Sequence, residues 1–521
     1  MPNQYMNADN QLLCPNCHTT ALVSHSSTRF TCKACGFLTA RTFKPQQLKM
    51  RPVKFKRLFI TCAVEGQPLH KPALAVVKKY CEVTGAELVV IPRDYYLSQP
   101  AMMRPADRGK SLEWKRQRRK YAKGIVPYLR RPDWQLNNNL RLRGSAYISP
   151  TNQNVLSGKL PLGAGHSLIL AHPQQAFEDT YGGGERGVLR IMTTGAITKA
   201  VYSASEVGDK AEFHHVLGGL IVEIRDNKVF YTRHVGFASD GSFQDLDTVW
   251  TAEGPTDAPR TEALVFGDLH CAERVKTVFD DQFMPGGLVD RLRPKRVMIH
   301  DGLDGFFINH HKSVFEMAAG HDSLADTAAE IDEFVKLFQW ACDLYPDTQF
   351  VAVGSNHTDW FTKWAAGECK STRRAVLLLH AKLRAWLFER ATNPQRVPEA
   401  MDFVAALINR KNFKVLHSSD QLEVKGVELS LHGHRGPLGS RATIKTFAKL
   451  GTKGMSGHRH QAGRYLGWMI VGTCGPTKGG YRDPIDAATH THGLLYGSGK
   501  RTHVTFFKDQ CYIDWREGVK K

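Results

Sequence analysis

Residues 262–270 read EALVFGDLH, an apolar run that ends in a glycine, an aspartate and a histidine. Four later segments have the same design: an apolar run of strand length, followed by polar residues rich in His, Asp and Asn. They are KRVMIHDGLDG at 295–305, TQFVAVGSNH at 348–357, VELSLHGH at 427–434 and GMSGHRH at 454–460. Short apolar runs bounded by polar residues are typical of buried strands. We therefore expect five strands that each end in side chains able to carry chemistry.

The segments between these strands favour helices, so the expected fold class is α/β. Residues 272–283 (AERVKTVFDDQF) and 323–345 (SLADTAAEIDEFVKLFQWACDLY) have the apolar spacing of helices. In open α/β sheets the carboxyl ends of the strands face one crevice, so residues distant in sequence can converge there. The residues expected to converge are Asp268, His270, Asp301, Asp304, Asn356, His357, His432, His434, His458 and His460. A single pair of this kind is usually a coincidence, but five pairs in order indicate a metal site.

The five polar blocks resemble those of a known family. The order GDLH, HDGLD, GSNH, LHGH, GHRH is similar to the five signature blocks of the calcineurin-like metallophosphoesterases. The resemblance covers roughly residues 262–510, about half of the chain. It implies a two-sheet metallophosphoesterase sandwich flanked by helices. The layout of the site is most similar to that of the SbcD-type repair nucleases.

The resemblance also implies a role for each polar residue of the blocks. One metal ion would be held by Asp268, His270 and His460, and the other by Asn356, His432 and His458. Asp301 would bridge the two ions, His357 would act as general acid or stabilise the transition state, and Asp304 would support the ligands from behind.

The chain departs from the family pattern at three points. His300 and Ser355 stand where the family usually has glycine. Both residues precede a ligand and do not replace it, so we expect them to alter the shape of the crevice more than the number of metal ions. The fourth block offers two histidines, and His434 is an alternative to His432 as the ligand.

The ligand types indicate the reaction. Mixed imidazole and oxygen ligands suit Mn, Fe or Zn better than Ca or Mg. We expect two divalent ions, manganese above all, with Mg, Fe or Zn as alternatives. Two ions about 3.5–4 Å apart lower the pKa of a bridging water and offset charge on the leaving oxygen. The bridging hydroxide would attack the phosphodiester in line, without a covalent enzyme intermediate.

Two C-x-x-C pairs lie near the N-terminus and are separated by 14 residues. They are Cys14 with Cys17 and Cys32 with Cys35. Four thiolates at this spacing can close a tetrahedral site around one structural zinc ion, and so small a module needs the metal to fold. The pattern resembles a zinc ribbon. Ribbons commonly bind nucleic acid but also serve as structural or protein–protein elements, and redox-active or free thiols are the alternative interpretation.

A strongly basic segment spans residues 104–143, with 13 Lys and Arg against 3 Asp and Glu. Trp114, Tyr121, Tyr128 and Trp134 are interleaved with these charges. Basic residues neutralise phosphates, and aromatic rings can stack on unpaired bases. A solvated helix face with its aromatic residues in the core is the alternative, but the net charge of +20 favours nucleic acid. We expect DNA contacts from Lys115, Arg116, Arg118, Arg119 and Lys120.

The length of 521 residues predicts two or three compact units. We divide the chain into a zinc ribbon at 1–48, an α/β region with the basic segment at 51–255, and a catalytic domain at 261–515. RLFITCAV (57–64), PALAVVKKYCEVTG (72–85) and ELVVIP (87–92) predict a β-α-β unit, and residues 219–235 predict a hairpin. Residues 251–260 (TAEGPTDAPR) are interpreted as a linker.

Targeting features are not recognisable in the sequence. The first 20 residues lack the pattern of a signal peptide, and no uninterrupted apolar run approaches 18 residues. The 11 cysteines favour a reducing compartment over a disulfide framework. We therefore expect a cytoplasmic protein (in the host cytoplasm for a phage protein) with no membrane partner. A homo-oligomer and an unidentified protein partner both stay open.

Taken together, these features predict a two-metal-dependent phosphodiesterase that acts on DNA, in host-DNA degradation or DNA processing. A ribbon on a strongly basic chain also resembles the host-DNA-degradation nucleases that some large lytic siphophages make early in infection. The first alternative is a phosphomonoesterase or protein phosphatase of the same superfamily, which shares the metal site but needs no charge of +20. The second is a catalytically inactive nucleic-acid-binding scaffold, against which the complete ligand set argues. The sequence does not decide between endo- and exonuclease, or between single and double strands.

Overall fold

The computed structural model describes residues 22–26, 29–32, 38–40, 51–95, 121–183, 187–305, 308, 327–371, 373–437, 442–477 and 486–518, with the first three ranges described as backbone only. The chain forms two compact units, residues 1–51 and 52–521. In the described part of the chain, no helix is both long enough and apolar enough to cross a membrane.

The first unit contains a small antiparallel sheet. Its strands are β1 (Leu22–Ser26), β2 (Arg29–Cys32) and β3 (Leu38–Ala40), in the order β1-β2-β3. Cys32 is the last residue of β2, whereas Cys14, Cys17 and Cys35 lie outside the described residues. The zinc ribbon and its zinc ion therefore stay predictions.

A six-stranded sheet carries the first three polar blocks. Its order is β20 (Phe413–Leu416), β19 (Gln349–Val353), β18 (Arg296–Ile299), β17 (Ala263–Val265), β26 (Thr491–Leu495) and β27 (Arg501–Thr505). The pairings from β17 to β20 are parallel, and those of β26 are antiparallel. Parallel neighbours need crossover connections, which helices supply here. They are α4 (Leu288–Leu292), α6 (Thr327–Leu344), α7 (Asn356–Ala366), α8 (Arg374–Arg390) and α9 (Ala400–Ile408).

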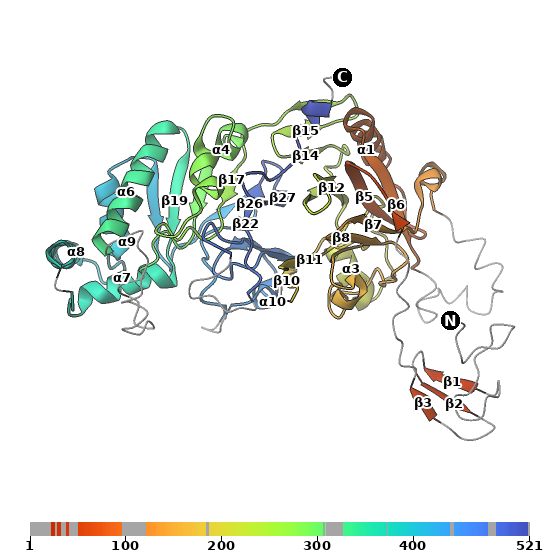
Figure 1. Ribbon diagram of the computed structural model, residues 1–521, viewed down its shortest axis with the longest axis horizontal. Coiled ribbons are helices and arrows are strands. Elements are labelled where there is room, and N and C mark those ends of the chain that lie inside the picture. The colour runs from red at the N-terminus through yellow and green to blue at the C-terminus, as the bar shows by residue number, and fades with distance from the viewer. Residues whose placement is uncertain are drawn as a thin grey trace. The chain divides into compact units, whose positions relative to one another are not determined.

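This sheet is buried on both faces, which explains why its strands are almost continuously apolar. On one face lie α6 and α9 (Figure 1). Phe334 and Phe338 of α6 are four residues apart and so share one side of the helix; the ring of Phe338 lies 6.1 Å from that of Phe350 in β19. On the other face, residues such as Val265 pack with Met455 of a second sheet.

The second sheet has eleven strands and joins distant parts of the chain. Its order is β21 (Glu423–Val424), β22 (Val427–Glu428), β23 (Lys453–Ser456), β25 (Trp468–Ile470), β24 (Gly463–Tyr465), β10 (Phe177–Tyr181), β11 (Val188–Thr193), β9 (Ser167–Leu170), β8 (Leu140–Arg143), β7 (Asp133–Asn137) and β4 (Arg51–Pro52). The junction is the β10–β24 pair, in which Glu178 lies opposite Gly463. Figure 1 shows β10 and β11 beside the C-terminal strands.

A four-stranded sheet confirms the predicted β-α-β unit and hairpin. Its order is β13 (Phe230–Gly236), β12 (Gly218–Ile224), β5 (Arg57–Val64) and β6 (Glu87–Arg93), and α1 (Lys71–Thr84) connects the parallel pair β5 and β6. Helix α1 ends at Gly85, whose φ of 68° is accessible to glycine at little cost. The hairpin turn is held by Asp226, whose Oδ1 accepts the backbone N–H groups of Lys228 and Val229.

Two sequence interpretations are wrong. Residues 272–283 form two short 3-10 helices, Lys276–Val278 and Asp280–Phe283, because the Val275 N–H donates to Cys474 O at 2.7 Å and so leaves the helical pattern. Residues 251–260 are not a free linker: Pro255–Asp257 forms β16, which pairs with β15 (Thr248–Trp250) and, through it, β14 (Phe243–Asp245).

The fold is mixed α/β, as predicted. The remaining α-helices in the described part of the chain are α3 (Glu206–His214) and α10 (Ile444–Ala448). The division into domains at 1–48, 51–255 and 261–515 stays a prediction. Strands from both sides of the segment 251–260 belong to the eleven-stranded sheet.

Candidate metal centre

Three neighbouring parallel strands bring the first three blocks together. Asp268 follows β17, Asp301 follows β18, and Asn356 follows β19 as the first residue of α7. The pairing continues beyond the strands, since the His270 N–H donates to Asp301 O at 2.8 Å. These blocks therefore meet at one edge of the six-stranded sheet, as the sequence predicted.

The second sheet supplies the last two blocks. His432 follows β22, while His458 and His460 follow β23. The Gly457 N–H donates to His432 O at 2.8 Å, which holds these two loops together. The His458 N–H donates to Asp268 Oδ2 at 2.7 Å and so ties the loops to the six-stranded sheet.

The structure gathers the predicted ligands into three overlapping groups that can hold metal ions. Within each group the ligand atoms lie within 4.8 Å of one another. The groups are Asp268, His270, Asp301 and His460; His270, Asp304 and His357; and Asp301, His432 and His458. Asp301 belongs to the first and the third group, the position expected of a residue that bridges two ions.

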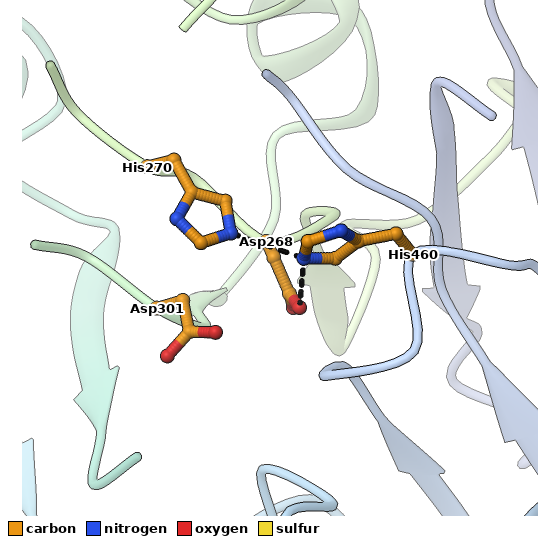
Figure 2. A group of neighbouring side chains, drawn as sticks. All are labelled: Asp268, His270, Asp301 and His460. Carbon is orange, nitrogen blue, oxygen red and sulfur yellow. Dashed lines mark hydrogen bonds and ion pairs between the residues drawn. The ribbon is translucent and has the colours of Figure 1, made fainter. Parts of the chain in front are cut away.

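The first group is arranged around facing nitrogen and oxygen atoms (Figure 2). His460 Nε2 lies 3.2 Å from Asp268 Oδ2 and 3.0 Å from His270 Nε2. The Asp304 carboxylate accepts a hydrogen bond from His270 Nδ1 at 3.1 Å. Because this bond places the proton on Nδ1, Nε2 of His270 is left as the metal-binding nitrogen. Asp304 thus orients His270, and its supporting role at a metal centre stays a prediction.

The third group is built from Asp301 and two histidines. His432 Nε2 lies 3.1 Å from Asp301 Oδ2. His434 belongs to none of the three groups, and its Nε2 instead lies 4.0 Å from Asp359 Oδ2. Between the two candidates in the fourth block, the geometry therefore favours His432.

Asn356 is positioned by the start of α7. Ser355 is the N-cap of this helix, and its Oγ accepts the Thr358 N–H at 3.2 Å. The residue that replaces the family's usual glycine therefore orders the turn that carries the ligand.

Several buried polar atoms of the site lack a hydrogen-bond partner in the described part of the chain. Four of them are Asp268 Oδ1, Asp301 Oδ1, Asn356 Oδ1 and His432 Nδ1, and both ring nitrogens of His300 and of His434 lack a partner as well. Such atoms are rare in folded proteins and cost roughly 1–3 kcal/mol each. All four belong to expected metal ligands, so the residues present fit a centre that is completed by cations.

The charge of the site also calls for cations. The side chains of Asp268, Asp301 and Asp304 are at most 3% exposed, and no Lys or Arg pairs with them within the described residues. Burial raises the pKa of Asp301, but the surrounding histidines hold it well below its usual value, so the carboxylate stays ionised. Burial lowers the pKa of His270, but Asp304 and the other carboxylates raise it to about 9. The pocket therefore favours positive charge.

The backbone at the site is unusual. Four expected ligands adopt a positive φ that only glycine takes easily: His270 at 46°, Asp301 at 42°, His458 at 75° and His460 at 54°. Residues in this region cost of order 1–3 kcal/mol each and cluster at functional sites. The strain aims these side chains at the shared centre.

His357 belongs to the second of the three groups and has a fixed orientation. Its Nδ1 lies 2.7 Å from Asp304 O, and a carbonyl can only accept, so Nδ1 carries the proton. Its Nε2 lies 3.9 Å from Asp301 Oδ2. The ring of Trp360 lies 4.3 Å away at an angle of 36° and restricts the imidazole.

Two supporting residues were missed from the sequence. Glu330 of α6 accepts the backbone N–H groups of Asp304 and Gly305 and so holds the loop after β18. Burial and the charge of Asp304 raise the pKa of Glu330 to about 8. In the sequence, Glu330 could have been noticed as an acidic residue within the apolar stripe of a helix. Trp360 gave no recognisable signal.

The basic segment is only partly described. Lys115, Arg116, Arg118, Arg119 and Lys120 lie outside the described residues. Tyr121, Tyr128 and Trp134 are half-buried and pack against hydrophobic clusters. For these three rings the core interpretation is the better supported one.

Comparison with known proteins gives one relative. No family model matches the sequence, and no solved structure matches it. The chain is similar to Protein A1 of Escherichia phage T5, with 28% identity over 480 residues that cover 87% of this chain and 82% of that protein. The match includes most of both chains and supports a phage origin.

Replacing Asp301 tests its predicted role as the residue that bridges two metal ions. We expect wild-type protein to bind two Mn²⁺ ions per chain. Asp301→Asn should retain fewer than one, because the first and the third group each lose a ligand. Equilibrium dialysis followed by elemental analysis measures this. The exposed residue Asp347 gives a matched control, and Asp347→Asn should bind as wild type does. Two ions retained by Asp301→Asn would contradict the bridging role.

Gly457 allows the centre to be perturbed without removing a ligand. A Cβ at this residue would lie 2.0 Å from Asp268 Oδ1, so the carboxylate would have to move. We expect Gly457→Ala to weaken Mn²⁺ binding by about 10- to 100-fold, the usual effect of disturbing a ligand's support. Isothermal titration measures the affinity. Gly497→Ala, whose Cβ would have no atom nearer than 4.0 Å, should leave the affinity unchanged.

Proposed function

We propose that this chain is a metal-dependent phosphodiesterase that cleaves DNA, with a catalytic domain built as a calcineurin-like metallophosphoesterase sandwich. The observation that carries the proposal is the convergence of five polar blocks from two sheets into overlapping His and Asp groups that share Asp301. The packing of the six-stranded sheet between helices and a second sheet supports the sandwich.

The residues that would hold the metal ions follow from the groups. Asp268, His270, His460 and Asp301 would hold one ion, and His432, His458 and Asp301 the other. The resemblance adds Asn356 to the second set. When bound, two divalent ions would lower the pKa of water and offset negative charge on the phosphate oxygens. Manganese is our first choice, since imidazole and carboxylate ligands are mixed here.

His357 would act on the leaving group. The hydrogen bond from its Nδ1 to Asp304 O fixes the tautomer and the direction of the ring, and Trp360 restricts rotation. Nε2 therefore faces the metal-binding groups, from where it would donate a proton to the departing oxygen as general acid. Asp304 contributes twice, because its carboxylate also orients His270.

DNA is the proposed substrate because the rest of the chain suits a polyanion. The net charge of +20 speeds capture of nucleic acid. The basic segment and the zinc ribbon would grip the strand outside the catalytic domain. Similarity to Protein A1 of Escherichia phage T5 supports a phage origin, and we propose host-DNA degradation or DNA processing as the role.

Phosphomonoesterases and protein phosphatases of the same superfamily share this arrangement of ligands, so the substrate must be tested directly. An inactive scaffold is less well supported, because the His and Asp residues of the five blocks gather into groups that could hold a metal ion.

Digestion of plasmid DNA with Mn²⁺ tests the proposal. We expect wild-type protein to cut DNA, and Asp301→Asn and chelator-treated protein to lose the activity. Cutting of the circular form indicates an endonuclease, whereas loss of linear DNA alone indicates an exonuclease. Gel electrophoresis over time distinguishes these results. Turnover of a small aryl phosphate monoester without any cutting of DNA would instead establish a phosphomonoesterase.

Charge removal tests the basic segment. Replacing Arg116, Arg118 and Arg119 with Ala should weaken DNA binding and reduce the slope of log K against log salt, by about 0.9 per lost phosphate contact on duplex DNA. Fluorescence anisotropy between 50 and 200 mM salt measures both effects. Lys449→Ala, at the end of α10, is a control for a lost surface charge. An unchanged slope in the triple variant would instead support the interpretation of the segment as a solvated helix face.

A further inference from the structure

A cavity of about 250 Å³ lies beside the metal centre, lined by residues of β10, β24 and α10 and by the loop after β23. The roles predicted for the five polar blocks do not involve this cavity. Its lining includes Arg459, Gln461, Lys445, Tyr465, Ile444 and Glu178.

The loop after β23 connects the cavity to the expected ligands. His458 and His460 belong to the metal-binding groups, while Arg459 and Gln461, which alternate with them, line the cavity. Both histidines adopt a positive φ, which turns the backbone sharply between neighbouring residues of this loop. Consecutive Cα atoms are only 3.8 Å apart. A group bound at the metal ions would therefore lie within about the length of one nucleotide from the cavity.

The mouth of the cavity carries uncompensated positive charge. Arg459 and Lys445 are exposed, and neither forms an ion pair with the described residues. A guanidinium in this position suits a phosphate, to which it can donate two parallel hydrogen bonds. The one carboxylate in the lining is Glu178, which can accept from the exocyclic amino group of a base.

The walls suit a flat, partly apolar group. The Tyr465 hydroxyl donates to Asn154 Oδ1 at 2.8 Å, which fixes the ring. Ile444 adds apolar surface, and the Gln461 side chain donates to Asp179 O, which holds the wall between β10 and the metal loop. An ordered aromatic ring beside apolar surface is a platform on which a base can stack.

We propose that this cavity binds the nucleotide next to the scissile phosphodiester, with Arg459 and Lys445 on its phosphate and the base against Tyr465. The proposal rests on the proposed function and names how its substrate is held. It distinguishes a polymer from a small phosphate ester, because only a polymer places a neighbouring nucleotide at the metal centre.

Comparison of two substrates tests this assignment. The variants are Arg459→Ala, Lys445→Ala and Ile444→Trp, the last of which fills the cavity without changing its charge. The substrates are a DNA oligonucleotide, single-stranded and duplex, and bis(p-nitrophenyl) phosphate, a diester with no neighbouring nucleotide. Charge-assisted hydrogen bonds of about 1.5–3 kcal/mol correspond to about a tenfold or larger effect. We expect kcat/KM on the oligonucleotide to fall at least tenfold more than on the aryl diester, chiefly through KM.

The controls separate this cavity from the metal centre. Lys449→Ala removes a charge from the same helix region outside the cavity and should behave as wild type on both substrates. Mn²⁺ content, measured for each variant, should equal that of wild type. Equal losses on both substrates would assign these residues to the metal loop and overturn the proposal, and so would unchanged cleavage of the oligonucleotide. A manganese-loaded wild type that cuts neither substrate would overturn the proposed function itself, and this inference with it.

Discussion

The hydrogen bond from the His458 N–H to Asp268 Oδ2 joins the two sheets at the point where the chemistry is expected. It is 2.7 Å long and partly buried, and the absence of a side chain at Gly457 makes room for the carboxylate. It fixes the relation of the loops after β17 and β23 together with the approach of His460 Nε2 to Asp268 Oδ2 at 3.2 Å and the β-bridge between Asp268 and Thr473. The dependence runs in both directions, because the sheets must pack correctly for the bond to form. The centre is therefore a property of the interface between the sheets rather than of either one.

That interface also explains which parts could be predicted from the sequence. The ends of β17, β18 and β19 were predictable because a parallel sheet places the carboxyl ends of neighbouring strands together. The convergence of His432 and His458 with Asp301 rested on family resemblance, since no local rule fixes which edge of a second sheet meets the first. Residues 272–283 were misjudged because their apolar spacing suits a helix, whereas a backbone bond to Cys474 draws Val275 out of it. Tertiary pairing outweighed local propensity there.

The partnership of β10 with β24 was not predictable for the same reason. It pairs residues 285 positions apart, Glu178 and Gly463, and extends the second sheet far into the N-terminal half of the chain. No periodicity in the sequence reports such a pairing. Its consequence is functional, because β10 forms one wall of the cavity next to the metal loop. The region 51–255, which carries none of the five blocks, thereby contributes to the surroundings of the centre.

The energetics of the centre are consistent with a resting state completed by cations. Four expected ligands hold a strained backbone, each at a cost of order 1–3 kcal/mol, and three carboxylates are buried together with no Lys or Arg paired to them among the described residues. Neighbouring histidines offset part of this negative charge, whereas the backbone strain is absent from an unfolded chain. Glu330 reduces the problem only locally, by fixing the backbone of the loop after β18. Ions that bind the folded arrangement and not the unfolded chain would stabilise the fold through that difference. The strain and the charge are therefore coherent as the preparation of a site whose geometry exists before the ions arrive, and in which the orientation of His357 is already fixed.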